Sequence, residues 1–163
     1  MTAKLWPHVC RDTGIELAVR KVSPALMNAL RTLYPAPEPP MVEGDYGEGV
    51  GKKKEPNEAD PGYKQAQLEY RVLILQKSQR LLIERGVVVE LGDEQKEEVG
   101  VLRAFWLSEH GKELPGSDKM VYVLYIALGT PEDLTELIEA ISRRSQPTEV
   151  AIAEANSSFR SEV

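Results

Sequence analysis

A chain of 163 residues with 42% hydrophobic residues is long enough for one ordinary domain with a hydrophobic core, and two independent domains are not expected. The 26 acidic and 20 basic side chains give a net charge of -6 and an isoelectric point near 5.1, which disfavours binding to nucleic-acid phosphates. The longest apolar run, residues 120–128, falls short of the roughly 20 residues that span a bilayer.

Charge is distributed unevenly along the chain. Residues 64–85 carry five basic and two acidic side chains, whereas residues 86–163 carry seven basic and 15 acidic ones. A basic helical segment followed by an acidic C-terminal half indicates internal charge complementarity, which salt screens at exposed positions. Because Cys10 is the only cysteine and no signal-peptide pattern is present, we expect a cytoplasmic protein.

The N-terminal segment predicts one strand and one helix. Residues 15–22 alternate apolar and polar side chains after a Thr-Gly turn, as in a half-buried strand. Ser23 offers a helix cap and Pro24 suits the first helical position, while leucines recur at helical spacing until Tyr34 precedes Pro35. We therefore expect a short helix over residues 24–33.

The next segment, residues 35–62, predicts a long connector. It holds six of the 11 prolines and five glycines, with few large apolar side chains to bury. It is longer than an ordinary loop, and such segments are usually functional or flexible. We expect an extended or hairpin-bearing, mobile connector.

The strongest helix pattern covers residues 63–85. Asp60 and Pro61 provide a cap and a first-turn proline, and Gly86 ends an uninterrupted helical segment. Its apolar stripe is wide, and we predict that a protein partner shares this surface with the core. The competing interpretation is a central helix buried all round. The candidate binding residues are Leu68, Val72, Leu75 and Leu82, and the pattern is widened by Tyr63, Tyr70, Ile74 and Leu81.

Two further helices are expected before residue 128. Residues 87–91 suit either a strand or an extended connector, and Asp93 is the expected cap of a helix that runs to Ser108. Ser117 is the expected cap of a second helix, although its β-branched residues also suit a buried strand. The first of these helices should direct Val99, Leu102, Phe105 and Trp106 inward.

The C-terminal region carries a clear helix start at Thr130 and Pro131, where Glu132 and Asp133 face the positive end of the helix dipole. A last weak helix is expected over residues 148–156. The whole pattern predicts an α+β fold, predominantly α-helical, with a short N-terminal strand region and about five helices. The expected divisions are a strand-helix arm (1–34), the connector (35–62), a main helical domain (63–145) and a weak helix with a flexible tail (146–163).

Motifs for chemistry are incomplete. His8 and Cys10 alternate beside Pro7, but no second pair completes a tetrahedral metal site, and His110 stands alone. The glycine-rich and lysine-rich stretch 44–54 lacks the first glycine and the serine or threonine of a phosphate loop. Clustered carboxylates at 93–98 and 132–136 are explained by helix N-termini. We therefore expect no catalytic residue, no metal, no cofactor and no nucleic-acid contact. Aromatic residues that suit either the core or a partner interface are Phe105, Trp106, Tyr122 and Tyr125.

Three segments resemble small tail-morphogenesis proteins of long-tailed phages, in particular the tail assembly chaperones. They are residues 39–43 (PPMVE), 55–63 (EPNEADPGY) and 68–70 (LEY), and the strand-helix pattern at 14–33 and helix start at 129–134 are compatible with that group. The resemblance implies a non-enzymatic protein that binds the long helical tape-measure protein during tail assembly. Alternatives are a structural accessory of the phage head, neck or tail, and a small enzyme whose site is assembled from scattered residues.

Overall fold

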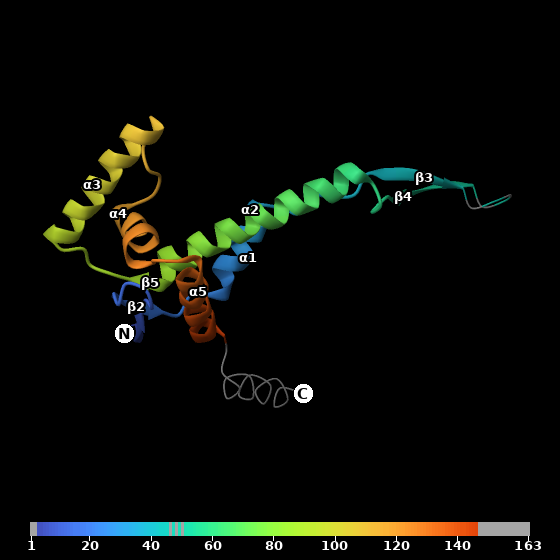
Figure 1. The fold of residues 1–163 in the computed structure, drawn as a ribbon. Coiled ribbons are helices and arrows are strands. Elements are labelled where there is room, and N and C mark those ends of the chain that lie inside the picture. Colours follow the sequence, from blue (N-terminus) through green and yellow to red (C-terminus); the bar gives the residue numbers. More distant parts are fainter. Residues whose placement is uncertain (1–2, 46, 48, 50, 147–163) are drawn as a thin grey trace, which may run out of the picture. The chain divides into compact units, whose positions relative to one another are not determined.

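The computed structural model describes residues 3–45, 47, 49 and 51–146. Within these residues the predicted α+β, predominantly helical class is confirmed: five α-helices and one π-helical segment accompany five short strands (Figure 1). The predicted helix over residues 148–156 lies outside the described residues.

The described chain divides into two compact units, which we call the core unit and the hairpin unit. The core unit comprises residues 3–24 and 81–146, and the hairpin unit comprises residues 25–80. These divisions differ from the expected boundaries after residues 34 and 62. The N-terminal strands belong with the C-terminal half because strand β2 pairs with strand β5, far along the chain.

The core unit contains a three-stranded antiparallel sheet in the order β1-β2-β5. Its strands are β1 (Leu5–Val9), β2 (Glu16–Arg20) and β5 (Val87–Val88). Strand β2 is the predicted strand, and its alternation buries Leu17 and Val19. Strand β1 was not expected from the sequence, because Pro7 interrupts its pattern; at the edge of the sheet a proline is tolerated.

The apolar run 120–128 enters the core as helix. Helix α4 (Asp118–Val121) continues into the π-helical segment η1 (Tyr122–Ala127), so the competing strand interpretation is wrong. Ser117 is the predicted cap and accepts a hydrogen bond from the Met120 N–H at 3.3 Å. The π spacing alters which side chains turn inward. Within this run Met120, Val121, Tyr122, Val123, Ala127 and Leu128 are buried.

Helix α5 (Pro131–Ser145) packs against β2 and buries Leu137 and Ile141. It begins as predicted, with Thr130 accepting a hydrogen bond from the Asp133 N–H at 3.3 Å. Asp133, however, does more than face the helix dipole. It is 1% exposed, and its carboxylate accepts hydrogen bonds from the backbone N–H groups of residues 11, 12 and 129 at 3.0, 3.4 and 3.2 Å.

The Asp133 carboxylate therefore ties the β1–β2 turn to the start of α5. Burial alone would raise its pKa, but the three backbone donors and the positive charge of Arg11 outweigh burial and hold the pKa below its ordinary value. The same carboxylate, after burial itself, raises the pKa of the neighbouring Cys10 thiol.

Helix α3 (Asp93–His110) differs from the sequence prediction in its N-cap and in the width of its buried face. Its N-cap is Gly92, which supplies no side-chain hydrogen bond, so the expected Asp93 cap is wrong. Its inner face is also narrower than expected. Val99 is buried, but Phe105 is 59% exposed, because the bulk of the core unit covers only one side of this helix. Gly111 ends it in the left-handed conformation.

The hairpin unit contains helix α1 (Pro24–Leu33) apart from Pro24, the antiparallel hairpin β3 (Met41–Asp45) and β4 (Lys52–Pro56), and the first 20 residues of helix α2 (Pro61–Gly86). The predicted bounds of α1 are confirmed, and the connector contains the hairpin that was one of its two expected forms. The Tyr70 hydroxyl donates to the Tyr34 carbonyl at 2.8 Å, and the Lys77 ammonium lies 5.3 Å from the Tyr34 ring centre. No described residue of this unit is buried.

The C-terminal end of α2 belongs to the core unit, where Ile83 and Gly86 are buried. Cations bind its last carbonyls: the Lys119 ammonium donates to the Glu84 and Val87 carbonyls at 2.6 and 2.9 Å. The Arg20 guanidinium donates to the Arg85 carbonyl at 2.6 Å. Burial, followed by the charges of Arg20 and Arg85, lowers the pKa of Lys119.

Candidate protein-binding surfaces

The structure separates the four predicted binding residues into two environments. Leu68, Val72 and Leu75 share one face of α2 in the hairpin unit and are 57%, 56% and 57% exposed. Leu82 is half-buried in the core unit. The interpretation of α2 as a helix buried all round is therefore wrong for the first three residues. We call these three residues the α2 stripe.

A different side of α2 from the stripe contacts Tyr34, the residue that follows α1. Tyr70 and Lys77, which contact Tyr34, lie on that other side, and all four residues that widen the apolar pattern are half-buried. The stripe borders a groove of about 380 Å³, which is lined by Gln65, Leu68, Glu69, Val72, Leu73 and Gln76. The Gln65 amide donates to Glu69 at 2.9 Å, so one edge of the groove is polar. Lys64 and Arg71 are exposed along the other edge.

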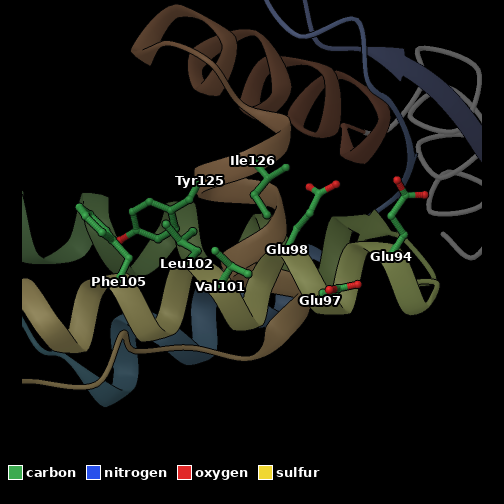
Figure 2. A pocket seen from close by; sticks show the side chains of 8 residues that line it. All are labelled: Glu94, Glu97, Glu98, Val101, Leu102, Phe105, Tyr125 and Ile126. Atoms are coloured by element: carbon green, nitrogen blue, oxygen red, sulfur yellow. The ribbon is translucent and has the colours of Figure 1, made fainter.

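A second groove lies on the core unit, between α3 and η1. Its volume is about 570 Å³, and we call it the α3 groove. Figure 2 shows three glutamates towards the start of α3 and apolar side chains further along, with Tyr125 and Ile126 facing them from η1. Val101 is 67% exposed, so the apolar part of this groove is uncovered within the described chain. The lining residues are Glu94, Glu97, Glu98, Val101, Leu102, Phe105, Tyr125 and Ile126.

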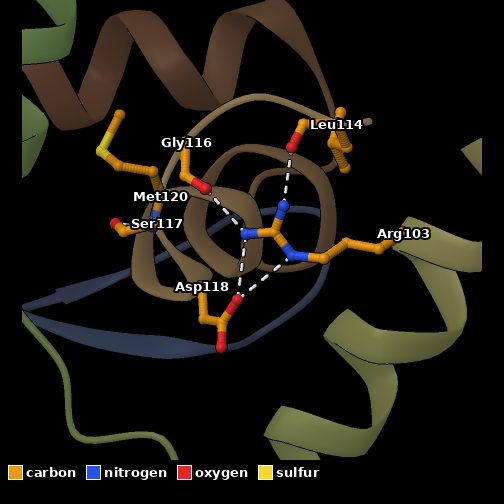
Figure 3. A network of polar contacts seen from close by, with 6 residues as sticks. All are labelled: Arg103, Leu114, Gly116, Ser117, Asp118 and Met120. Atoms are coloured by element: carbon orange, nitrogen blue, oxygen red, sulfur yellow. Dashed lines mark hydrogen bonds and ion pairs between the residues drawn. The ribbon is translucent and has the colours of Figure 1, made fainter. Parts of the chain in front are cut away.

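A network around Arg103 holds the turn that follows α3. Its guanidinium donates to the Leu114 and Gly116 carbonyls at 2.6 and 2.7 Å and pairs with Asp118 at 2.9 Å (Figure 3). These bonds tie α3 to the start of α4, which leads into η1, and thereby fix both walls of the α3 groove. The Trp106 ring adds a contact with Tyr125, with ring centres 5.9 Å apart.

The charged side chains that line the α3 groove are all acidic. Among the described residues no cation forms an ion pair with any of the three groove glutamates. Burial raises the pKa of the neighbouring Tyr122 hydroxyl, and the negative charge of Glu98 adds to that increase. A ligand with basic groups would therefore be attracted to this rim.

The sequence did not identify the α3 groove, because Phe105 and Trp106 were both assigned to the inner side of the helix. A signal was present in the spacing. Glu94, Glu98, Val101 and Phe105 recur at intervals of four, three and four, which places them on one helical face. Glu97 and Glu98 also lie beyond the first turn, where the helix dipole explains acidic residues less well.

The residues with reactive side chains are dispersed. Cys10 is buried, and its raised pKa keeps it a protonated thiol, which is a poor nucleophile. The buried Nε2 atom of His8 has no hydrogen-bond partner within the described chain, and the His110 ring lies tilted against the Trp106 ring with ring centres 4.3 Å apart. Lys52 pairs with Glu43 across the hairpin at 3.7 Å. In the described part of the chain, no three side chains of the metal-binding types lie close enough to share an ion, and no helix is long and apolar enough to cross a membrane.

Comparison with protein-family models, curated proteins and solved structures finds no match for this chain. The likeness to tail assembly chaperones therefore rests on the sequence segments quoted above.

Proposed function

We propose that this chain is a non-enzymatic protein-binding protein that holds an amphipathic helical client, and that the client is the tape-measure protein of a phage tail, bound in the host cytoplasm during assembly. The α2 stripe carries this proposal: three aliphatic side chains, each more than half exposed, stand on one face of a long helix. Contiguous exposed apolar side chains are typical of interaction surfaces.

The absence of buried residues in the described part of the hairpin unit supports the same role. None of its described residues is buried, so its helices contribute little to a core and are available for contact. A long client helix presents apolar side chains at intervals of three and four residues, which match the spacing of Leu68, Val72 and Leu75. The polar residues that border the stripe would allow release when a competing assembly surface becomes available.

The proposal is tested by co-expression with the tape-measure protein encoded in the same genome. The triple variant Leu68→Ala, Val72→Ala, Leu75→Ala should reduce the soluble tape-measure protein and weaken binding at least tenfold, about 1.4 kcal/mol. Its thermal unfolding should stay close to that of the wild type, because the three side chains are exposed.

A matched control is Leu33→Ala, which removes a leucine that is 74% exposed and lies outside the stripe. It should leave client binding unchanged. Equal binding by the triple variant and the wild type would contradict the role of the stripe. Mass spectrometry of purified particles provides the second readout: a chaperone should be absent, and stoichiometric presence would favour a structural accessory instead.

A further inference from the structure

We propose that the α3 groove of one copy receives the α2 stripe of a second copy, so that the protein self-associates through an acidic surface and a basic, apolar helix that both belong to this chain. The inference concerns the chain's own assembly, and it stands whatever client the protein binds.

The α3 groove requires a ligand that is both apolar and basic. Val101, Phe105 and Tyr125 are 67%, 59% and 45% exposed, and covering them would remove a substantial apolar area from water. The glutamate rim repels acidic partners and is not neutralised by any cation of the described chain. Like charges held together on one helix favour a partner that brings the opposite charge.

The α2 stripe has these two properties. Its three aliphatic side chains are exposed, and Lys64 and Arg71 lie beside them and are also exposed. Charge along the chain follows the same division: residues 64–85 have a basic excess, with five basic and two acidic side chains. Residues 86–163, which include the groove, have 15 acidic and seven basic ones.

The order of groups along the two helices also agrees. In α3 the carboxylates of Glu94 to Glu98 precede Val101 and Phe105. In α2 Lys64 precedes the stripe, and Arg71 lies within its first half. A parallel alignment that sets Arg71 opposite Glu98 therefore places Leu75, which lies further along α2, against the apolar end of the groove. A helix seated in an apolar groove is a common mode of protein recognition.

A contact of this size suits a reversible association. One short helix segment and one groove bury less than a large obligate interface, so the complex should separate on dilution and at high salt. While it persists, each occupied stripe is covered and shielded from non-specific aggregation.

The test is sedimentation velocity of the full chain without client, over a range of protein and salt concentrations. The wild type should show a mass above that of the monomer that increases with concentration and decreases with salt. The pair Glu97→Lys, Glu98→Lys should be monomeric, and so should the pair Lys64→Glu, Arg71→Glu, because each variant has two surfaces of like charge. The dissociation constant should increase at least tenfold in both.

The decisive experiment is to mix the two charge-reversed variants and measure their association. The reversed groove of one is complementary to the reversed stripe of the other, and the remaining two surfaces keep their natural charges, so association should return. The control for Glu97→Lys, Glu98→Lys is the pair Glu90→Lys, Glu113→Lys, which makes the same change of net charge at exposed sites outside the groove. This control should associate like the wild type.

Three results would overturn the proposal: a monomeric wild type at all concentrations, equal weakening by the control pair, or no recovery on mixing. A charge-dependent change in circular dichroism or stability without a change of mass would indicate docking within one chain and would also overturn it. Phe105→Ser tests the apolar half of the groove without changing charge and should weaken association as well. The pair Glu97→Lys, Glu98→Lys leaves the α2 stripe unchanged, so it should lose self-association and still bind the client, and the two proposals can therefore fail independently.

Discussion

The two units of this chain use similar helices for different purposes. Among the described residues, every buried one lies in the core unit, whereas the helices and hairpin of the hairpin unit include none. Helix α2 belongs to both units. Near its C-terminus Ile83 and Gly86 are buried, but towards its N-terminus Leu68 and Val72 are exposed. An apolar stripe at helical spacing therefore predicts a helix, but it does not predict what covers the stripe.

The largest contrast between the units should appear on truncating leucines. Leu137 is fully buried against the sheet, so Leu137→Ala should lower the free energy of unfolding by about 2–5 kcal/mol through lost contacts and a residual cavity. Leu75→Ala in the hairpin unit, measured at a protein concentration low enough to keep the chain monomeric, should change it by less than about 0.5 kcal/mol. Urea unfolding followed by far-UV circular dichroism measures both. Similar losses for the two variants would show that Leu75 is covered in solution.

Two glycine substitutions compare a closely packed position at the end of α2 with an open position in α3. A Cβ atom at Gly86 would lie 2.6 Å from the Ile141 Cγ2 atom, so Gly86→Ala should cost about 1–3 kcal/mol through overpacking. The matched control is Gly100→Ala in α3, where a Cβ atom meets nothing within 4 Å. That change should stabilise the protein by about 0.5–1 kcal/mol through helix propensity. A stabilising Gly86→Ala would mean that α2 and α5 are less closely packed than described.

The Asp133 carboxylate predicts how the stability of the core unit depends on pH. Its pKa is below the ordinary value of 3.8 when folded, so it contributes stability above that pH, and the contribution is lost as pH falls through the lower folded value. Asp133→Asn should lower the melting temperature at pH 7 and should flatten its decline between about pH 5 and pH 2. Scanning calorimetry across that range checks the slope. An unchanged slope would assign acid unfolding to other carboxylates.

The smallest expected difference lies within α2 itself. Amide hydrogens of residues 64–75 should exchange at least tenfold faster than those of residues 81–86, a difference of about 1.4 kcal/mol in local opening, because only the latter are anchored in a core. Hydrogen exchange with mass spectrometry measures this difference and also tests the expected mobility of the connector. Equal protection along the helix would indicate that both units unfold together.

Local sequence signals predicted the starts of several helices. Asp60 accepts a hydrogen bond from the Tyr63 N–H at 2.8 Å, and Ser117 and Thr130 act as the expected caps. Each of these caps depends on side chains within three residues, so no knowledge of the rest of the chain is needed. The Asp93 cap failed because Gly92 occupies the cap position, one residue earlier.

Contacts between distant segments could not be predicted in the same way. The pairing of β2 with β5, the bonds from Asp133 to the β1–β2 turn and the position of Phe105 all depend on how remote elements pack. The α3 groove arises in the same manner, since α3 and η1 form its two walls and Arg103 ties the intervening turn to α3.

Helix content, cap positions and the apolar face of α2 thus follow from spacing and short-range hydrogen bonds, which the order of residues alone specifies. Burial is different, because it depends on which surfaces meet, and that choice is made by the whole chain. Tertiary structure alone decided that Ile83 enters the core, that Leu68, Val72 and Leu75 stay exposed, and that an acidic rim borders the exposed apolar side chains of α3.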